Sequence, residues 1–474
     1  MNDDSFPDVT AEAAERLAEH WKSLASAAFP VVPPGPPGTT LAALPATAPE
    51  QGESLAQLLD DTWRMIVPQL VHWQHPGFLG YYPTSNSPAS VLAELVTAGL
   101  GVQGMMWSTS PAATELEQRV CDWLALALGL PEHFTHASGH GGGVIQDSAS
   151  SAVLIALVSA LNRVSRGRWR QDGADGRHRV YCTDQANTCV PKAARVCGVG
   201  EPTLVPVLRG THVMDPAALA RRLDADRAAG LVPTAVVASV GTTLTCAVDP
   251  VREIGRICRE RDVWLHVDAA YAGSAALCPE HRGINDGVEF ADSYAVNVHK
   301  WLRAGTPCDV LWVADRSSLT DALRTGPSSY LVDPVTESGT VVNFKDWQIP
   351  LGRPMRALKL WYVLRAHGLQ ELRSVIRRDI GLAARLARLV VDEPGFELVA
   401  HALGLVVFRL GHEDQTRELT VRLAGEPGLL CTPAAVDGHP VLRAAVGSPY
   451  ADDAGIDRAW ATVRSHARGI PGPG

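Results

Sequence analysis

The sequence predicts an α/β protein in which helices flank a mostly parallel sheet. Between about residues 85 and 355, short apolar runs alternate with helical patterns, which is typical of parallel sheets. Within this region, an apolar run at residues 234–240 is followed by a helix and by a second run at residues 263–268, and together they predict a βαβ unit. At 474 residues the chain is too long for one ordinary domain, so we expect two or three.

The elements of this central region follow from local signals. Asp249 and Pro250 predict the start of the helix in the βαβ unit, with Asp249 as the N-cap and Pro250 at the first helical position. Further strands are expected at residues 293–298 and 309–313. Residues 315–347 contain no clear strand but several Gly, Pro, Ser and Thr, so we expect a mobile loop there.

The two ends of the chain show different patterns. Residues 10–28 and 54–70 predict amphipathic helices, joined by a proline-rich segment at residues 31–38. No basic residue flanks this segment, so we interpret it as a stiff connector rather than as a polyproline ligand. After Pro354 a long helix is expected to about residue 392. The remainder predicts a small α+β domain, with strands at residues 397–400, 405–408 and 441–446.

Composition and charge exclude several functional classes. Apolar residues make up 46% of the chain and charged residues 20%, which excludes disorder along its length. The net charge of −9 argues against a nucleic-acid binder, and the arginine-rich residues 163–179 contain glycines typical of a solvated loop. No window holds 18 uninterrupted apolar residues and the nine cysteines form no C-x-x-C pair, so we expect no membrane span and reduced thiols. The acidic N-terminus has no secretory signal, which predicts a cytoplasmic location.

Three segments carry residues typical of one cofactor. Asp268 ends a predicted strand, at the carboxyl edge where parallel sheets bind ligands. Lys300 also follows a strand and can bind an aldehyde as a Schiff base. The small residues within 141–151 lead into a helix whose N-terminus favours a phosphate. Each signal alone is weak, but an acid, a lysine and a phosphate cradle are together what pyridoxal phosphate (PLP) requires.

Nine short blocks of sequence accompany these three segments. The blocks are residues 72–76, 82–84, 110–117, 141–146, 183–186, 265–274, 287–293, 299–302 and 347–353. With them the chain resembles the PLP-dependent group II amino-acid decarboxylases, most of all the aromatic-L-amino-acid decarboxylases and their aldehyde synthase relatives. The resemblance implies PLP-dependent transferase fold type I, with a mostly parallel seven-stranded sheet flanked by helices.

The resemblance also implies how the chain is divided and assembled. A helical N-terminal arm at residues 1–84 would be exchanged between the subunits of a homodimer with shared active sites. A large PLP domain would cover residues 85–355 and include a mobile catalytic loop at about residues 317–345. A small domain would follow at residues 356–474. The apolar arm has little core of its own, which fits such an exchange.

Cofactor roles carry over from the resemblance residue by residue. It implies that Lys300 binds the PLP aldehyde and that Asp268 pairs with the pyridine nitrogen. Ala270 would pack against one face of the ring, and Thr243 would support Asp268. The other residues of the implied cofactor-binding set are Ala149, Ser150 and Asn297 at the phosphate, together with Asn187 and Gly352.

The reaction implied by the resemblance is decarboxylation of an aromatic L-amino acid, of the tryptophan, tyrosine, phenylalanine or DOPA type, to an amine and CO2. His299 would help to position the substrate carboxylate, and loss of water around that carboxylate favours its release. Tyr330, on the mobile loop, would deliver a proton to Cα after CO2 leaves. The residues expected to line the substrate pocket are Trp73, Tyr82, Pro83, Thr84, Gln103, Met105 and His299.

Position 187 leaves the product open. Most decarboxylases of this group have a histidine there, stacked on the pyridine ring, whereas this chain has Asn187. An amide cannot shuttle a proton near pH 7 as an imidazole does. One interpretation is that Asn187 only replaces a packing residue. The alternative is that dioxygen intercepts the reaction, so that an aryl acetaldehyde, ammonia and hydrogen peroxide form; in the insect branch of the family, an Asn at this position accompanies that activity. Plant aldehyde synthases instead lack the loop tyrosine, which this chain retains as Tyr330.

Other departures concern the pocket and the phosphate cradle. Gln103 could hydrogen-bond a ring substituent or point to solvent, and Met105 discriminates poorly between ring shapes. Gly352 leaves room for a larger ring. Lys345 replaces an arginine of the catalytic loop, and the two are not interchangeable at a bidentate contact. Asp147 precedes the cradle where glycine is usual, and we expect its carboxylate to point away from the phosphate.

Other functional classes fit the sequence less well. An aminotransferase of the same fold would show a carboxylate-binding arginine in a different C-terminal motif. A cofactor-free binding protein would not need both Lys300 and Asp268. Two histidine pairs, at positions 72 and 75 and at 136 and 140, have no matching set of carboxylates or cysteines, so no metal is expected.

Overall fold

The computed structural model describes residues 4–26, 29–33, 35–324, 335 and 339–471. The chain divides into two compact units. The larger unit is continuous and comprises Ser85–Arg378, whereas the smaller combines Met1–Thr84 with Asp379–Gly474. The division into three parts expected from the sequence remains a prediction.

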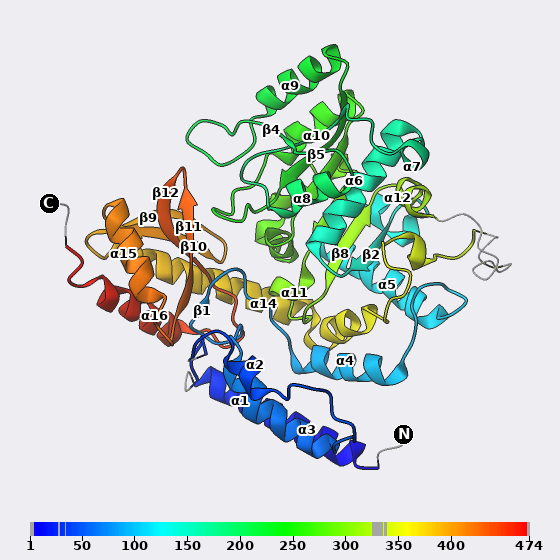
Figure 1. Cartoon of the computed structure of the whole chain (residues 1–474). Coiled ribbons are helices and arrows are strands. Elements are labelled where there is room, and N and C mark those ends of the chain that lie inside the picture. The colour runs from blue at the N-terminus through cyan, green and yellow to red at the C-terminus, as the bar shows by residue number, and fades with distance from the viewer. Residues whose placement is uncertain (1–3, 27–28, 34, 325–334, 336–338, 472–474) are drawn as a thin grey trace. The chain divides into compact units, whose positions relative to one another are not determined.

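A seven-stranded sheet forms the centre of the larger unit, as expected. Its strand order is β2-β8-β7-β6-β5-β3-β4, and Figure 1 labels β2, β8, β5 and β4. All neighbouring strands are parallel except where β8 pairs antiparallel with both β2 and β7. The strands are β2 Gly142–Gln146, β3 His178–Cys182, β4 Thr203–Leu204, β5 Val232–Ser239, β6 Trp264–Asp268, β7 Ser293–Val296 and β8 Asp309–Val313.

Helices connect these strands and cover the sheet. The α-helices are α4 Pro88–Leu100, α5 Pro111–Leu128, α6 Ala149–Ser165, α7 Trp169–Asp172, α8 Cys189–Val196, α9 Pro216–Ala228, α10 Val251–Glu260, α11 Val298–Trp301 and α12 Arg316–Leu323. Short 3-10 segments are Glu132–Phe134, His136–Ser138, Ala272–Leu277, Pro279–Asn285, Val288–Phe290 and Phe344–Asp346. Helix α12 lies within the expected mobile loop, so the loop prediction was wrong for its first residues.

The predicted βαβ unit is confirmed, because β5 and β6 are parallel neighbours joined by α10. The predicted cap was wrong. Pro250 is the N-cap of α10, and no side chain caps this helix. The carboxylate of Asp249 instead accepts hydrogen bonds from the backbone N–H groups of Met214 and Ser239, both at 2.7 Å. The Asp249 carboxylate therefore binds backbone groups from other segments and, contrary to the prediction from the local sequence, does not cap the helix.

Helix α6 is largely buried where it packs on this sheet. Its residues Ala152 and Ile155 lie in one apolar cluster with Val144 of β2 and Leu311 of β8. Other side chains of α6 belong to a second cluster with β3 and β5. A helix that is apolar nearly all round is held by packing on several sides. The sheet therefore fixes the position of the N-terminus of α6.

The smaller unit is built on a five-stranded sheet of order β1-β11-β12-β10-β9. Strand β1, from the N-terminal segment, pairs in parallel with β11 from the C-terminal segment. Both strands were missing from the sequence prediction. The elements are α1 Phe6–Ala25, α2 Thr39–Ala43, α3 Leu55–Asp61, a π turn Thr62–Ile66, a 3-10 turn Val67–Gln69, β1 Phe78–Leu79, β9 Phe396–Ala402, β10 Leu405–Leu410, α15 Glu413–Leu423, β11 Leu430–Val436, β12 His439–Ala445 and α16 Asp453–Ala467.

The long helix expected after Pro354 is present as α14, Ala357–Val391. It is interrupted at Gly368, whose φ of 65° and ψ of 167° are not helical. Glycine adopts such a positive φ without a steric penalty, which explains the residue at the kink.

Candidate active site

The predicted acid and lysine come together at one edge of the larger sheet. Asp268 is the last residue of β6, and Asn297 directly follows β7. Because β8 runs antiparallel to β7, its first residue, Asp309, lies at the same edge. Lys300 lies on α11, the one-turn helix that begins after Asn297. This is the edge at which open α/β sheets bind ligands.

The strand register places three polar side chains on one face of the sheet. Asp268 is opposite Ala295, and Ala295 is opposite Leu311. Asn297 comes two residues after Ala295, and Asp309 comes two residues before Leu311. Because side chains two residues apart point to the same face of a sheet, Asn297 and Asp309 point to the face of Asp268. Ala295 and Leu311 pack against α6. The three polar side chains therefore share the face that α6 covers.

Contacts of the backbone fix the turn that carries Lys300. Its amide N–H donates to the carbonyl of Asn297 at 3.1 Å, and its own carbonyl accepts from the hydroxyl of Ser85 at 3.4 Å. The amide of Ser85 also donates to the carbonyl of His299 at 3.1 Å. The Lys300 side chain is half-buried and engaged in an interaction. Its charge acts on the buried carboxyl of Asp309, which places the two within electrostatic reach.

His299 is buried beside this lysine and held by the backbone. Its Nδ1 lies 2.8 Å from the carbonyl oxygen and 3.1 Å from the amide nitrogen of Cys308. Burial and, to a lesser extent, the charges of Lys300 and Lys359 lower the pKa of His299 to about 4, although the hydrogen bond to the backbone of Cys308 opposes them. The imidazole is therefore neutral at pH 7, and it can offer a hydrogen bond but no positive charge.

The predicted phosphate-binding residues lie at the N-terminus of α6. Ser148 is the N-cap, and its hydroxyl accepts the amide N–H of Ser151 at 3.2 Å. Ala149 and Ser150 occupy the first turn, whose amides have no partner within a helix. Asp147 is exposed. A helix N-terminus at this position suits a phosphate group.

Buried atoms without partners support a ligand at this edge. Within the described part of the chain, Asn297 Oδ1 and both carboxyl oxygens of Asp309 are buried and have no hydrogen-bond partner. Buried polar atoms nearly always have a hydrogen-bond partner, so these unpaired atoms indicate that a bound ligand supplies the partner. An acid, a lysine, a helix N-terminus and these unpaired polar groups together fit PLP.

Asn187 and Thr243 meet at the ends of two neighbouring strands. Asn187 follows β3 and Thr243 follows β5, which pairs in parallel with β3. The Asn187 Nδ2 donates to Thr243 Oγ1 at 3.2 Å, and its Oδ1 accepts the amide of Cys189 at 3.0 Å. Both polar atoms of the amide thus bind the protein. The expected contact of Thr243 with Asp268 remains a prediction.

Gln103 binds the backbone of the segment that contains Gly352. Its Oε1 accepts the amide N–H of Arg353 at 3.1 Å, a role that neither interpretation from the sequence included. A Cβ at position 352 would lie 3.3 Å from that oxygen, so glycine permits this approach. Next to it, the carbonyl of Met105 accepts the amide of Lys345 at 2.8 Å. Hydrogen bonds therefore join residues 103–105 to residues 345–353.

Arg353, whose amide binds Gln103, also forms a buried ion pair. Arg353 Nη2 lies 2.7 Å from Glu117 Oε1 and 2.9 Å from the carbonyl of Ile145 in β2. Glu117 Oε1 also accepts the amide of Ile145 at 2.8 Å. The guanidinium stacks on Phe344 at 4.7 Å. The pair thus connects α5, β2 and the segment of Gly352.

Several predicted site residues lie elsewhere in the chain or outside the described part. Trp73, Tyr82, Pro83 and Thr84 belong to the smaller unit, so their role in the substrate pocket remains a prediction. Tyr330 lies outside the described residues. Ala270 is half-buried two residues after Asp268, and its amide donates to Asp268 Oδ1 at 3.1 Å.

Asp309 is the residue that the sequence prediction missed. It is fully buried, although it begins a run that was recognised only as an apolar strand. A charged residue at the start of a buried strand was the available signal, because buried carboxylates are rare without a partner or a function.

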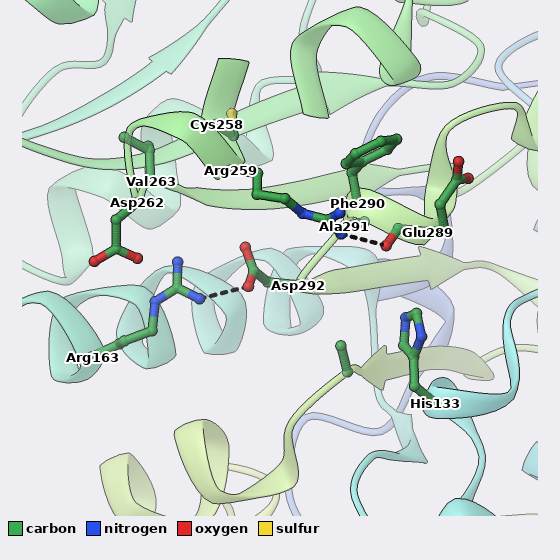
Figure 2. Close-up of a pocket in the computed structure, with 11 residues that line it drawn as sticks. His133, Arg163, Cys258, Arg259, Asp262, Val263, Glu289, Phe290, Ala291 and Asp292 are labelled. Carbon is green, nitrogen blue, oxygen red and sulfur yellow. Dashed lines mark hydrogen bonds and ion pairs between the residues drawn. The ribbon is translucent and has the colours of Figure 1, made fainter. Parts of the chain in front are cut away.

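Figure 2 shows a different pocket, of about 300 Å³, at the opposite edge of the sheet. Its lining includes Asp292, just before β7, and Ala314, just after β8. Arg163 pairs there with Asp292 at 2.5 Å, and Arg259 donates to the carbonyl of Glu289 at 3.3 Å. None of the predicted site residues lines it.

In the described residues, no three His, Cys, Asp or Glu side chains are grouped so that they could hold a metal ion. Among the described helices, none combines the length and the apolar character needed to span a bilayer.

Comparisons with known proteins identify the family of this chain. Residues 37–411 match the model of the pyridoxal-dependent decarboxylase conserved domain. The chain is 42% identical to phenylacetaldehyde synthase of Arabidopsis thaliana over 464 residues, which cover 95% of this chain and 93% of the relative. It is 38% identical to aromatic-L-amino-acid decarboxylase of Sus scrofa, covering 98% and 97% of the two chains. The crystal structure of Oryza sativa TDC with PLP and tryptamine superimposes with a TM-score of 0.94 at 36% identity, covering 98% of each chain. The chain therefore belongs to the pyridoxal-dependent decarboxylases, carboxy-lyases whose cofactor is pyridoxal 5′-phosphate.

Proposed function

We propose that this enzyme removes the α-carboxylate of an aromatic L-amino acid and releases the amine and CO2. The observation that carries the proposal is the meeting of Asp268, Lys300 and the N-terminus of α6 at one edge of the sheet. The named activities of the similar proteins support the aromatic substrate class and the decarboxylation. Tryptophan, tyrosine, phenylalanine and DOPA are the substrates to be compared.

The residues of this edge would divide the work as follows. PLP, when bound, supplies an electron sink for the bond between Cα and the carboxylate. Lys300 would supply a primary amine for the aldehyde of PLP, and the carboxylate of Asp268 would pair with the pyridine nitrogen and favour its protonation. The first turn of α6, with Ala149 and Ser150, holds the phosphate together with Asn297.

His299 would position the substrate carboxylate without neutralising it. Its imidazole is buried, its Nδ1 is engaged with Cys308, and its pKa of about 4 leaves it uncharged at neutral pH. A neutral hydrogen-bonding group orients a carboxylate but does not hold its charge in place. Loss of CO2 is then opposed less than it would be beside a cation. Tyr330 would return a proton to Cα.

The second candidate is oxidative formation of an aldehyde, and Asn187 favours it. The amide is bonded on both sides, to Thr243 and to the backbone of Cys189, and it carries no proton that titrates near pH 7. The similarity to a plant phenylacetaldehyde synthase does not distinguish the two candidates, because plant aldehyde synthases lack the loop tyrosine that this chain has as Tyr330. In this reaction the amino acid, O2 and water would give the aryl acetaldehyde, CO2, ammonia and hydrogen peroxide.

Product analysis tests the function directly. The purified holoenzyme is incubated with each of the four amino acids, in air and under nitrogen, and CO2, amine, aldehyde and peroxide are measured. Our proposal expects one amine for each CO2 and no dependence on oxygen. Aldehyde and peroxide formed in air in proportion to CO2 would establish the second candidate instead, and no CO2 from any aromatic amino acid would refute both.

We further propose that the active form is a homodimer with shared sites and an exchanged N-terminal arm. Large apolar side chains exposed along the first 100 residues support an interface there, since monomers seldom expose such groups together. They are Phe6, Leu41, Leu44, Leu58, Ile66, Leu70, Val71, Trp73, Tyr81, Leu92, Leu95 and Leu100. Light scattering of the purified protein tests the dimer, and a monomeric mass would refute it.

We also propose a cytoplasmic location. All nine cysteines are unpaired, and eight of them are buried, which suits a reducing compartment. Fractionation of the native cells tests this location, and recovery of the enzyme outside the cytoplasmic fraction would refute it.

A further inference from the structure

Asp309 is a carboxyl group that the chemistry proposed so far does not use. It has no exposed surface, and within the described residues neither of its oxygens has a hydrogen-bond partner. Burial raises the pKa of Asp309 well above its usual value, and the charges of Asp268 and Asp147 raise it further, while Lys300 opposes them. A buried carboxyl without a partner for its charge exists as the neutral acid.

Within the described residues, no neighbouring group forms a hydrogen bond with the carboxyl group of Asp309. The charges of Asp268 at the end of β6, of Asp147 after β2 and of Lys300 on α11 act on Asp309, but none of these groups forms a hydrogen bond with it. From α5, Glu117 is already bound to Arg353. Asn297 on the neighbouring strand end is neutral and also has an unpaired oxygen. His299, on α11, is uncharged near pH 7, with its Nδ1 held by Cys308.

A neutral carboxylic acid has one O–H donor, and the phosphate offers it an acceptor. Asp309 points to the face of the sheet on which α6 packs, at the edge where α6 begins. The phosphate of the cofactor is expected at that N-terminus, whereas Asp268 already serves the opposite end of the pyridine ring. We propose that Asp309 is held as a carboxylic acid and donates a hydrogen bond to the phosphate group of bound PLP.

This arrangement makes cofactor affinity depend on pH. The protonated acid attracts the phosphate, but an ionised Asp309 would repel it. Binding therefore favours the protonated form, and affinity is lost as the pH rises through the pKa of Asp309 in the protein. Each pH unit above that value weakens binding by up to about tenfold, since one proton is linked to one cofactor.

The test is a pH series of PLP affinity with the full-length apoenzyme, measured by quenching of its tryptophan fluorescence between pH 6 and 9. Asp309→Asn keeps the size and a donor N–H group but cannot ionise. We expect the dissociation constant of the wild type to rise more steeply with pH than that of Asp309→Asn, with a difference of tenfold or more at the alkaline end. Equal slopes for the two proteins would overturn the proposal.

Pyridoxal, which lacks the phosphate, distinguishes the phosphate from Lys300 as the partner of Asp309. With this probe the pH profiles of wild type and Asp309→Asn should coincide. A difference that persists with pyridoxal would show that Asp309 acts through Lys300 and would overturn the assignment. Asp147→Asn, which removes the exposed carboxylate nearby, should retain the steep wild-type slope with PLP. Circular dichroism confirms that each variant is folded, and none of these measurements depends on which product the enzyme makes.

Discussion

The side-chain amide of Asn187 donates a hydrogen bond to the hydroxyl of Thr243, at 3.2 Å, and so joins the loops that follow β3 and β5. Its carbonyl oxygen is bound to the amide of Cys189 at the start of α8. The side chain is therefore held in place at the edge where the cofactor is expected. Its chemistry, rather than its mobility, should decide what it contributes to the reaction.

We expect Asn187→His to lower the fraction of turnovers that yield peroxide. An imidazole can supply a proton near pH 7, and general acids of this kind typically contribute 10²–10⁴-fold to a step. The ratio of peroxide to CO2 in air measures the effect. Thr243→Val is the matched control, because it removes the acceptor of the Asn187 bond but adds no proton donor. If the wild type produces peroxide and Asn187→His leaves the ratio unchanged, Asn187 does not govern the product.

Lys300→Ala should abolish both turnover and the absorbance band of the covalently held cofactor. The other groups at the edge, Asp268 and the first turn of α6, are left intact, so PLP can still bind without a covalent link. Absorbance spectra and CO2 release measure the two effects. Lys192→Ala, an exposed lysine on α8, serves as the control and should behave as the wild type. Turnover retained by Lys300→Ala would contradict the assigned role.

Glu117→Gln should lower the free energy of unfolding of the larger unit by about 3–5 kcal/mol, because it leaves the charge of Arg353 buried without its partner. Urea denaturation followed by circular dichroism measures the loss. The exposed pair of Arg385 and Asp457, at 2.7 Å, provides the comparison. Asp457→Asn should cost less than about 1 kcal/mol. Similar losses of unfolding free energy for the two variants would contradict the expectation that the buried Arg353 pair stabilises the protein more than an exposed pair does.

Stability should fall as the pH drops from about 6.5 to 4. Burial lowers the pKa of His266 to about 4, so the folded protein binds fewer protons than the unfolded chain in this interval. The stabilisation is present above pH 6.5 and is lost as pH falls through the folded pKa. A shift of this size corresponds to roughly 3 kcal/mol at most. His266→Leu should flatten the slope of stability against pH, whereas the exposed His140→Asn should not. An unchanged slope in His266→Leu would refute the attribution.

The central fold and the cofactor edge were largely predictable from sequence. The strand ends at Asp268 and near Lys300 were visible because apolar runs and the polar residues after them are local signals. The role of Asp249 was not, since its partners, Met214 and Ser239, come from distant segments. Asp309 was hidden for the same reason, because only the antiparallel course of β8 brings it to the edge of Asp268.

The smaller unit shows another limit of local patterns. Strand β1 has only two residues, and β11 contains Pro433, which argues against a strand when it is read alone. The two strands stabilise each other through pairing across the length of the chain. The bond of Gln103 to Arg353 is likewise a contact between distant segments, so a pattern around Gln103 could not reveal it.

The pairing of β1 with β11 has a consequence for how the chain is made. Phe78 and Leu79 leave the ribosome early, but their partners Leu430 and Cys431 follow about 350 residues later, which takes roughly 20–70 s at typical synthesis rates. The continuous larger unit can form in that interval, whereas the smaller unit cannot close until synthesis is almost complete. During the wait, two apolar side chains that are buried in the finished protein stay exposed on the nascent chain. Chaperone binding to the first 84 residues would protect them until the last strands arrive.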